Sequence, residues 1–156
     1  MAAVVGSRFQ LPRGCQPFVG EVIVEVQLEN SFDAHLARIG QLADADVRRR
    51  TVQALVDTGA TDLVLPEDLV QALGLDFVES LVVEYADGRR SRRPVAGPVT
   101  LGAMGRRRHF DCVCGPAGTH ILLGQVVLES LDLLVDCKAQ RLLPRPESPD
   151  IALHRG

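Results

Sequence analysis

Hydrophobic and polar residues alternate clearly between positions 21 and 30. The apolar side chains of one face are Val22, Val24, Val26 and Leu28, and the other face is mainly polar. A period of two is typical of a half-buried strand, so the sequence predicts a strand here. Between positions 31 and 47 the pattern blurs, which leaves a helical turn and an elaborated loop both open.

A second strand is predicted at residues 51–56, where TVQALV runs directly into an Asp-Thr-Gly tripeptide at positions 57–59. Another apolar stretch follows at residues 63–65. The next segment, PEDLVQALG, has proline at an early position, acidic residues in its first turn and Gly74 at its end. Those signals predict a short helix.

The middle of the chain carries hairpin signals. Asp87 and Gly88 separate residues 81–85 from residues 89–95, and this pair favours a two-residue turn because both residues tolerate positive φ. The run ILLG at 121–124 leads into QVVLESL, which has helical spacing. Further strands are predicted at residues 99–101, 106–114, 133–136 and 141–143.

The length of 156 residues suits one compact domain, and 46% hydrophobic residues allow a small core. We expect the folded domain to span residues 19–144. Residues 1–18 form an N-terminal arm in this interpretation. Residues 145–156 are proline-rich and polar, which predicts a mobile tail.

The formal net charge of −3 gives the whole molecule no bias toward nucleic acid or an anionic membrane. Arginines nevertheless cluster at residues 48–50, 89–93 and 106–108. We interpret these clusters mainly as solvated strand ends and turn faces. The more specific alternative is that they form a surface that binds an acidic partner.

The N-terminal segment MAAVVGSRFQLPRG lacks the charged start and long apolar stretch of a secretory signal, and no segment approaches the roughly 20 apolar residues of a membrane span. We therefore expect a cytoplasmic protein. The scattered cysteines Cys15, Cys112, Cys114 and Cys137 are interpreted as reduced thiols.

A metal site at His109, Asp111, Cys112 and Cys114 is disfavoured by their spacing. Alternate residues of a strand face opposite ways, so the first two side chains would point away from the two cysteines. The sequence predicts no metal and no cofactor.

The tripeptide at 57–59 has a distinctive context. It ends one apolar strand, precedes Ala60 and a second apolar strand, and is matched later by ILLG at 121–124 and a helix. The combination of ALVDTGATDLVLP, a hairpin-rich middle and ILLG resembles the retropepsin-like (clan AA) aspartic proteases, most closely their bacterial single-lobe members. The resemblance covers residues 19–144 and implies a mainly β fold, a closed barrel with one or two short helices.

Two adjacent carboxyl groups that share one proton can activate water and polarise an amide carbonyl, because like charges about 3 Å apart resist joint ionisation. This chain has a single Asp-Thr-Gly and no repeat that could supply another. The second carboxyl is therefore expected from another copy, in a homodimer. The resemblance makes Asp57 the catalytic carboxyl, Thr58 a brace between the two loops and Gly59 a point of close approach.

The resemblance also implies roles for the surrounding residues. The hairpin tip matches in position the flap that closes over substrate, so the expected substrate-binding residues are Ala60, Tyr85, Ala86, Asp87 and Gly88. The expected support beneath the catalytic loop comes from Leu122, Leu123 and Gly124. Retroviral members carry an interface Asp–Arg pair where this chain has Thr61 and Gln125, which puts that manner of bracing the dimer in doubt; nearby Asp62 is a candidate to compensate.

The expected function is that of an aspartic endopeptidase acting on a polypeptide, without nucleic acid or membrane partners. The alternative is a catalytically silent domain that binds a peptide or partner protein in the same dimer groove. The intact Asp-Thr-Gly favours the enzyme.

Overall fold

The computed structural model of the protein describes residues 21–154 and 156. The segment interpreted above as lacking a secretory signal, the expected arm at 1–18 and Cys15 lie outside the described residues. Among the helices of the described part, none has the length and apolar character needed to cross a membrane.

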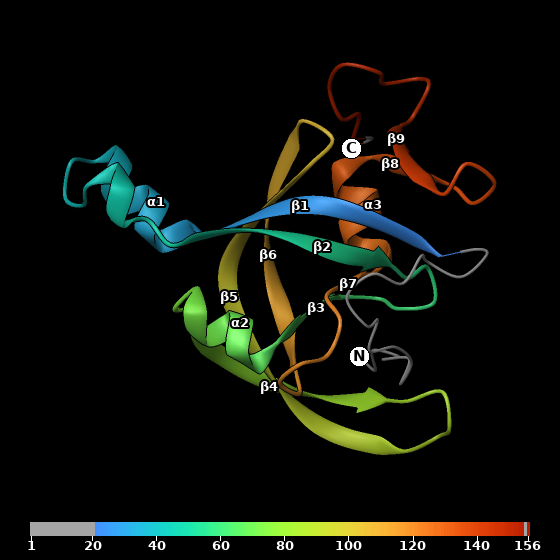
Figure 1. Ribbon diagram of the computed structural model, residues 1–156, viewed down its shortest axis with the longest axis horizontal. Coiled ribbons are helices and arrows are strands. Elements are labelled where there is room, and N and C mark those ends of the chain that lie inside the picture. Colours follow the sequence, from blue (N-terminus) through green and yellow to red (C-terminus); the bar gives the residue numbers. More distant parts are fainter. Residues whose placement is uncertain (1–20, 155) are drawn as a thin grey trace.

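Six strands form a closed ring, which confirms the predicted mainly β barrel (Figure 1). The order around the ring is β1 (Val22–Asn30), β2 (Arg49–Val56), β7 (Leu122–Leu123), β3 (Leu63–Pro66), β6 (Arg106–Gly115) and β5 (Arg90–Ala103). An antiparallel ladder between β1 and β5 closes it. A further strand, β4 (Asp76–Glu84), extends the sheet outward from β5.

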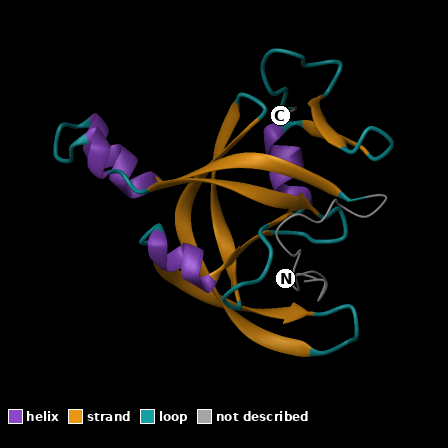
Figure 2. Cartoon of the chain, in the orientation of Figure 1, coloured by secondary structure: helices purple, strands orange, loops and turns teal. Residues whose placement is uncertain are grey.

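Three short helices accompany the barrel, against the one or two predicted (Figure 2). They are α1 (Ser31–Arg38), α2 (Glu67–Ala72) and α3 (Gln125–Leu131), and a 3-10 turn lies at Asp44–Asp46. For the region of α1, the sequence left a helical turn and a loop both open. It forms because the Asn30 side chain caps the helix by accepting a hydrogen bond from the Asp33 N–H, at 3.0 Å.

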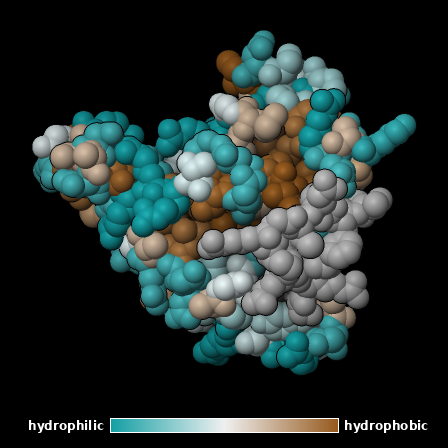
Figure 3. Space-filling view, in the orientation of Figure 1, coloured by the Kyte–Doolittle hydropathy of each residue, from teal (hydrophilic) through white to brown (hydrophobic). Residues whose placement is uncertain are grey.

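The largest fully buried side chains fill the barrel interior and the space beneath the helices. They include Leu28, Leu65, Leu73, Leu101 and Leu123. A smaller apolar cluster, which we call the second cluster, joins Val64, Val83, Val113 and Leu122. Hydrophobic atoms gather in the middle of the face seen in Figure 3, whereas the end around α1 is mainly hydrophilic.

Two local predictions were wrong. Residues 89–95 and 99–101 belong to one strand, β5, because the backbone continues through a register shift between Ala96 and Val99. The hairpin between β4 and β5 closes with three residues rather than two. Gly88 donates to the Tyr85 carbonyl at 2.8 Å with φ of +81°, and the Tyr85 N–H donates to Arg89. This is a turn followed by a left-handed glycine.

After α3 the chain forms the predicted terminal hairpin, β8 (Leu133–Asp136) with β9 (Arg141–Pro144). The buried carboxylate of Asp132 accepts hydrogen bonds from the Ser148 hydroxyl and the Leu153 N–H, and it pairs with Arg145 at 2.7 Å. These bonds hold the pKa of Asp132 at about 2, the Ser148 bond contributing most. The segment after Pro144 is thus in contact with the end of α3.

Candidate active site

Asp57 follows the last residue of β2, and hydrogen bonds fix its position on both sides. Its N–H donates to the Leu123 carbonyl at 3.0 Å, and its own carbonyl accepts from the Ala60 N–H at 3.1 Å. One carboxylate oxygen accepts from the Gly59 N–H at 3.0 Å. The loop is therefore closed around the Asp57 carboxylate, which keeps this side chain in one orientation.

The ILLG segment lies beside this loop. Within it, β7 pairs in parallel with β2 and antiparallel with β3, so it fills the gap that the loop leaves between the two strands. Beyond β7, the N–H groups of Gly124, Gln125 and Val126 donate to the carbonyls of the three residues that follow the Asp-Thr-Gly tripeptide, at 3.0 to 3.1 Å. This ladder of main-chain bonds ties the loop to the start of α3.

Gly124 is the point of closest approach between these two segments. A Cβ at this position would lie 2.4 Å from the Asp62 carbonyl oxygen and 2.6 Å from the Thr61 carbonyl group. Those atoms belong to the backbone and cannot rotate away. Only glycine therefore allows the loop and the start of α3 to pack at this distance.

The members of the Asp-Thr-Gly tripeptide differ from Ala60 in exposure. Asp57 is half-buried, and Thr58 and Gly59 are exposed, so the tripeptide faces outward from the barrel. Ala60 is only 1% exposed, and its N–H and C=O both bond within the loop region. The structure thus gives its side chain a packing position rather than a surface one.

The hairpin tip predicted to contact substrate lies at the end of β4 and β5. Ala86, Asp87 and Gly88 are exposed there. Tyr85 is half-buried and packs against the second cluster, which also contacts Leu55 near the Asp57 loop. One continuous apolar surface therefore connects the hairpin to the strand that carries Asp57.

Charged groups also order this tip. The Arg89 guanidinium lies 5.4 Å from the centre of the Tyr85 ring and pairs with Asp87 at 2.6 Å. The backbone N–H of Arg89 and its side chain both donate to Asp87 and lower the pKa of that carboxyl. The tip consequently carries an ionised aspartate held against an arginine.

Gln125 occupies one of the two positions where the retroviral ion pair is missing. Its amide donates to the Thr58 carbonyl at 2.9 Å, so it braces the Asp57 loop of its own chain. Sequence reasoning flagged this position but not its partner. Thr61 is engaged through its carbonyl, which accepts from the Val126 N–H.

Asp62 lines a cavity of about 750 Å³ between the β4 hairpin and β6, together with Glu79, Glu84, Arg90 and Asp111. One Asp62 carboxylate oxygen is buried without a hydrogen-bond partner in the described part of the chain. Burial raises the pKa of this carboxyl. Sequence reasoning considered Asp62 only as a substitute at the interface and missed the cavity, because its lining residues on β4, β5 and β6 come together only in the folded barrel.

Cys112 and Cys114 are free and buried, whereas His109 and Asp111 on the same strand are exposed. Burial raises the pKa of the Cys112 thiol to about 12, so the thiol stays protonated at neutral pH. Within residues 21–154, no group of three or more His, Cys, Asp and Glu side chains has the arrangement of a metal site.

A closed β barrel that holds an Asp-Thr-Gly loop against an apolar strand and a short helix is the arrangement expected of a single-lobe aspartic protease domain. A family model described as "gag-polyprotein putative aspartyl protease" matches residues 43–130, more than half of the chain. The chain belongs to this family of retropepsin-like aspartyl protease domains. No curated protein matches it.

Proposed function

We propose that the protein is an aspartic endopeptidase whose active site is completed by a second copy of the chain. The observation that carries this proposal is the Asp57 loop, with an outward-facing carboxylate fixed by main-chain bonds to β7 and by its own Gly59 N–H. Membership in an aspartyl protease family supports the same reaction class. Each chain supplies one such carboxylate.

In the proposed dimer, the two Asp57 carboxyl groups share one proton across a two-fold axis. The ionised carboxylate accepts a proton from water, and the water oxygen attacks the peptide carbonyl. The protonated carboxyl donates to the carbonyl oxygen, and the resulting tetrahedral species then breaks its C–N bond as the amine takes up a proton. The apparent pKa values of this chemistry belong to the pair.

Thr58 and the β4–β5 hairpin have supporting roles in the proposal. Thr58 is exposed beside Asp57, where its hydroxyl can reach the matching loop of the second copy. The exposed tip at Ala86, Asp87 and Gly88 covers an extended polypeptide in the groove as a flap, and Tyr85 contacts it from the edge of the second cluster. Leu122, Leu123 and Gly124 keep the catalytic loop rigid.

The catalytic unit in this proposal spans residues 19–144, which contain every barrel strand and the family match, with 145–156 as an appendage. A cytoplasmic location is supported by the free thiols of Cys112 and Cys114, since disulfides are rare in reducing compartments.

The test compares the full chain with its Asp57→Asn variant on a peptide library. We expect the wild-type protein to cleave peptides and the variant to lose at least about 10³-fold in kcat/KM, because the amide cannot accept the proton of water. The variant should keep the fold, as seen by circular dichroism. The specific activity should also fall on dilution as dimers dissociate.

A mixing experiment tests the shared site. Adding excess Asp57→Asn protein to a fixed amount of wild-type protein should inhibit cleavage, because mixed dimers carry only one carboxylate. A matched control is Asp150→Asn, which makes the same change at an exposed position and should not inhibit. Equal cleavage by the Asp57→Asn protein would overturn the enzymatic proposal, and an inactive wild-type protein that still binds peptides would establish the silent binding domain.

A further inference from the structure

We propose that the cavity beside the Asp57 loop is a substrate subsite that selects a basic side chain, lysine or arginine, of the polypeptide. This inference rests on the proposed function and names the substrate class of the same active site. The cavity has a volume of about 750 Å³. We call it the acidic cavity, and the lining residues that carry the argument are Asp62, Glu79, Leu81, Val95, Asp111 and Val113.

The strand register places five of these side chains on one face of the sheet. Val113 on β6 lies opposite Val95 on β5, and Val95 lies opposite Glu79 on β4. Opposed residues of antiparallel strands point to the same face, and so do residues two apart in one strand. Leu81 therefore shares this face with Glu79, and Asp111 shares it with Val113. Two carboxyl groups and three apolar side chains thus face the same space.

Asp62 reaches this face from the segment that precedes β3. The strand β3 pairs in parallel with β6, with Val64 opposite Val113. Two residues earlier in each segment are Asp62 and Asp111, so these two carboxyl groups take neighbouring positions on the same face. A Cβ on Gly97 would lie 2.3 Å from an Asp111 carboxylate oxygen, so the glycine leaves this oxygen room above β5. The cavity therefore collects three carboxyl groups.

These carboxyl groups lack counter-charges within the described residues. None of Asp62, Glu79 and Asp111 forms an ion pair there. Glu84 and Arg90 also line the cavity, but they pair with each other at 2.7 Å and add no net charge. The register also turns their side chains toward the opposite face of the sheet. The face that carries Glu79 is therefore left with an excess of negative charge.

Arg93 is a cation on the same face of β5, and a main-chain group holds it. Its guanidinium donates to the Cys114 carbonyl at 3.0 Å. It forms no ion pair within the described residues, and it is not one of the residues that line the cavity. The negative charge of the acidic cavity is therefore left for an occupant to neutralise.

The burial of Asp62 gives an independent reason to expect a cationic occupant. One of its carboxylate oxygens is buried and has no hydrogen-bond partner among the described residues. Burial raises the pKa of this carboxyl, because its charged form has lost contact with water. A buried polar group without a partner is costly, and a cation beside it would supply the missing interaction.

The apolar part of the lining suits the stem of a basic side chain. Val95 and Val113 are buried, and Leu81 is half-buried. Lysine and arginine can lay their apolar stems along such residues while the charged end reaches the carboxyl groups. A metal ion fits less well, because no group of three or more His, Cys, Asp and Glu side chains in residues 21–154 has the arrangement of a metal site.

The acidic cavity adjoins the proposed catalytic carboxylate. The Asp57 N–H donates to the Leu123 carbonyl, and the Asp62 carbonyl accepts from the Gly124 N–H. The two aspartates thus flank β7 on opposite sides, about 10 Å or two strand spacings apart. An extended chain advances about 3.3 Å per residue, so the basic side chain lies about three residues from the bond that is cut. Figure 1 shows the loop after β2 and the tip of the β4–β5 hairpin projecting toward the same side of the barrel.

The experiment measures the binding of fluorescein-labelled octapeptide pools to the full chain carrying Asp57→Asn, so that no peptide is cut. Each pool is randomised except at one position, which holds either lysine or norleucine, whose side chain is a similar apolar stem without the charge. Fluorescence polarisation should show a position at which the lysine pool binds about tenfold more tightly than the norleucine pool, the gain expected from a hydrogen bond between charged groups.

Two double variants of this protein test which residues carry the preference. Adding Asp62→Asn and Glu79→Gln should reduce the lysine preference to less than about twofold, and Glu79→Gln alone, at an exposed position, should lower it about twofold. The matched control is Asp150→Asn with Glu147→Gln, which removes the same two charges from exposed positions outside the cavity and should keep the preference. Circular dichroism should be unchanged in every variant.

The proposal is overturned if no pool binds, if lysine and norleucine pools bind equally at every position, or if both double variants lose the preference alike. Cleavage of the same pools by the wild-type protein separates this outcome from the proposed function. An inactive wild-type chain, with the lysine preference intact in the Asp57→Asn protein, would reject the protease and keep the subsite. Cleavage with no preference for lysine at any position would keep the protease and reject the subsite.

Discussion

The two ends of β2 are built by different forces. At the Val56 end, main-chain hydrogen bonds and the close approach at Gly124 hold the Asp57 loop, and apolar side chains surround it. At the Arg49 end, side-chain ion pairs centred on Glu29 hold the surface. Main-chain bonds and steric fit respond little to salt or pH, whereas exposed ion pairs respond to both. The first arrangement suits a loop of fixed geometry, and the second suits a surface whose side chains can adjust.

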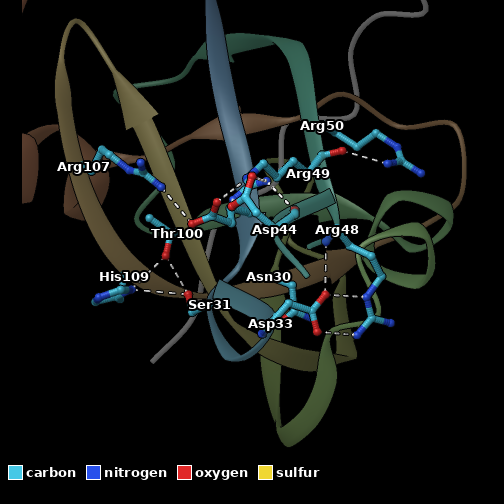
Figure 4. Close-up of polar contacts among 11 residues, drawn as sticks. Asn30, Ser31, Asp33, Asp44, Arg48, Arg49, Arg50, Thr100, Arg107 and His109 are labelled. Atoms are coloured by element: carbon cyan, nitrogen blue, oxygen red, sulfur yellow. Dashed lines mark hydrogen bonds and ion pairs between the residues drawn. The ribbon is translucent and has the colours of Figure 1, made fainter. Parts of the chain in front are cut away.

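A helix junction at the Arg49 end combines the two kinds of support (Figure 4). Asn30 donates from its amide to the Leu73 and Gly74 carbonyls at 2.8 and 3.2 Å, which links α1 to the end of α2. Asp33 accepts from the Arg48 backbone and side chain. This junction allows the charged end to be perturbed without touching Asp57.

The largest effect is expected from Gly124→Ala. The new Cβ would clash with backbone atoms of Thr61 and Asp62, so we expect a loss of about 3 kcal/mol in the free energy of unfolding, measured with urea. Gly59→Ala is the control, because its Cβ would meet only an Asp57 carboxylate oxygen at 3.3 Å and should cost less than about 1 kcal/mol. Similar losses in both variants would mean that close packing does not hold this end.

A smaller effect is expected from Asn30→Ala at the other end. This variant removes the cap of α1 and both bonds to the end of α2, so we expect a loss of about 2 kcal/mol in unfolding free energy. Asn30→Ser keeps a cap but not the link to α2, and should recover about half of that loss. A serine variant as stable as wild type would show that the link contributes nothing.

The smallest effect concerns acid pH and Asp33. Hydrogen bonds from the Arg48 side chain, more than any other cause, lower the pKa of this carboxyl, and burial opposes them. A carboxyl whose pKa is lower in the folded than in the unfolded state stabilises the protein at pH values above its ordinary pKa, near 4. This stabilisation is lost as the pH falls through the pKa of the folded state. Wild type should therefore exceed Asp33→Asn in melting temperature above about pH 5, and the difference should shrink as pH falls below the ordinary pKa of the carboxyl.

An isosteric change elsewhere serves as the reference for this pH series. Asp46→Asn alters an exposed aspartate on the turn after α1. Its melting temperature should follow that of wild type at every pH. A constant difference between wild type and Asp33→Asn across the series would show that the Arg48 pair does not stabilise through charge.

Local sequence signals were sufficient for much of the fold. Alternation over 21–30 and the strand before Asp57 gave correct strands, and the proline, acidic and glycine signals around residues 66–74 gave α2. They were insufficient at residues 31–38, because that helix depends on an Asn30 cap whose amide also contacts distant carbonyls of residues 73 and 74. The same signals predicted two strands in place of β5, because the irregular register at residues 96–99 interrupts the apolar pattern.

For the candidate site, the sequence alone predicted Asp57 and the ILLG segment, because a polar tripeptide between two apolar strands fits the chemistry of paired carboxyl groups. Only the tertiary structure decided that Gln125 braces Thr58, that Tyr85 joins the apolar cluster beside the Asp57 loop and that Arg49 and Arg107 both pair with Glu29. These contacts join residues far apart in the chain, so they depend on the register and closure of the barrel, which no local pattern specifies.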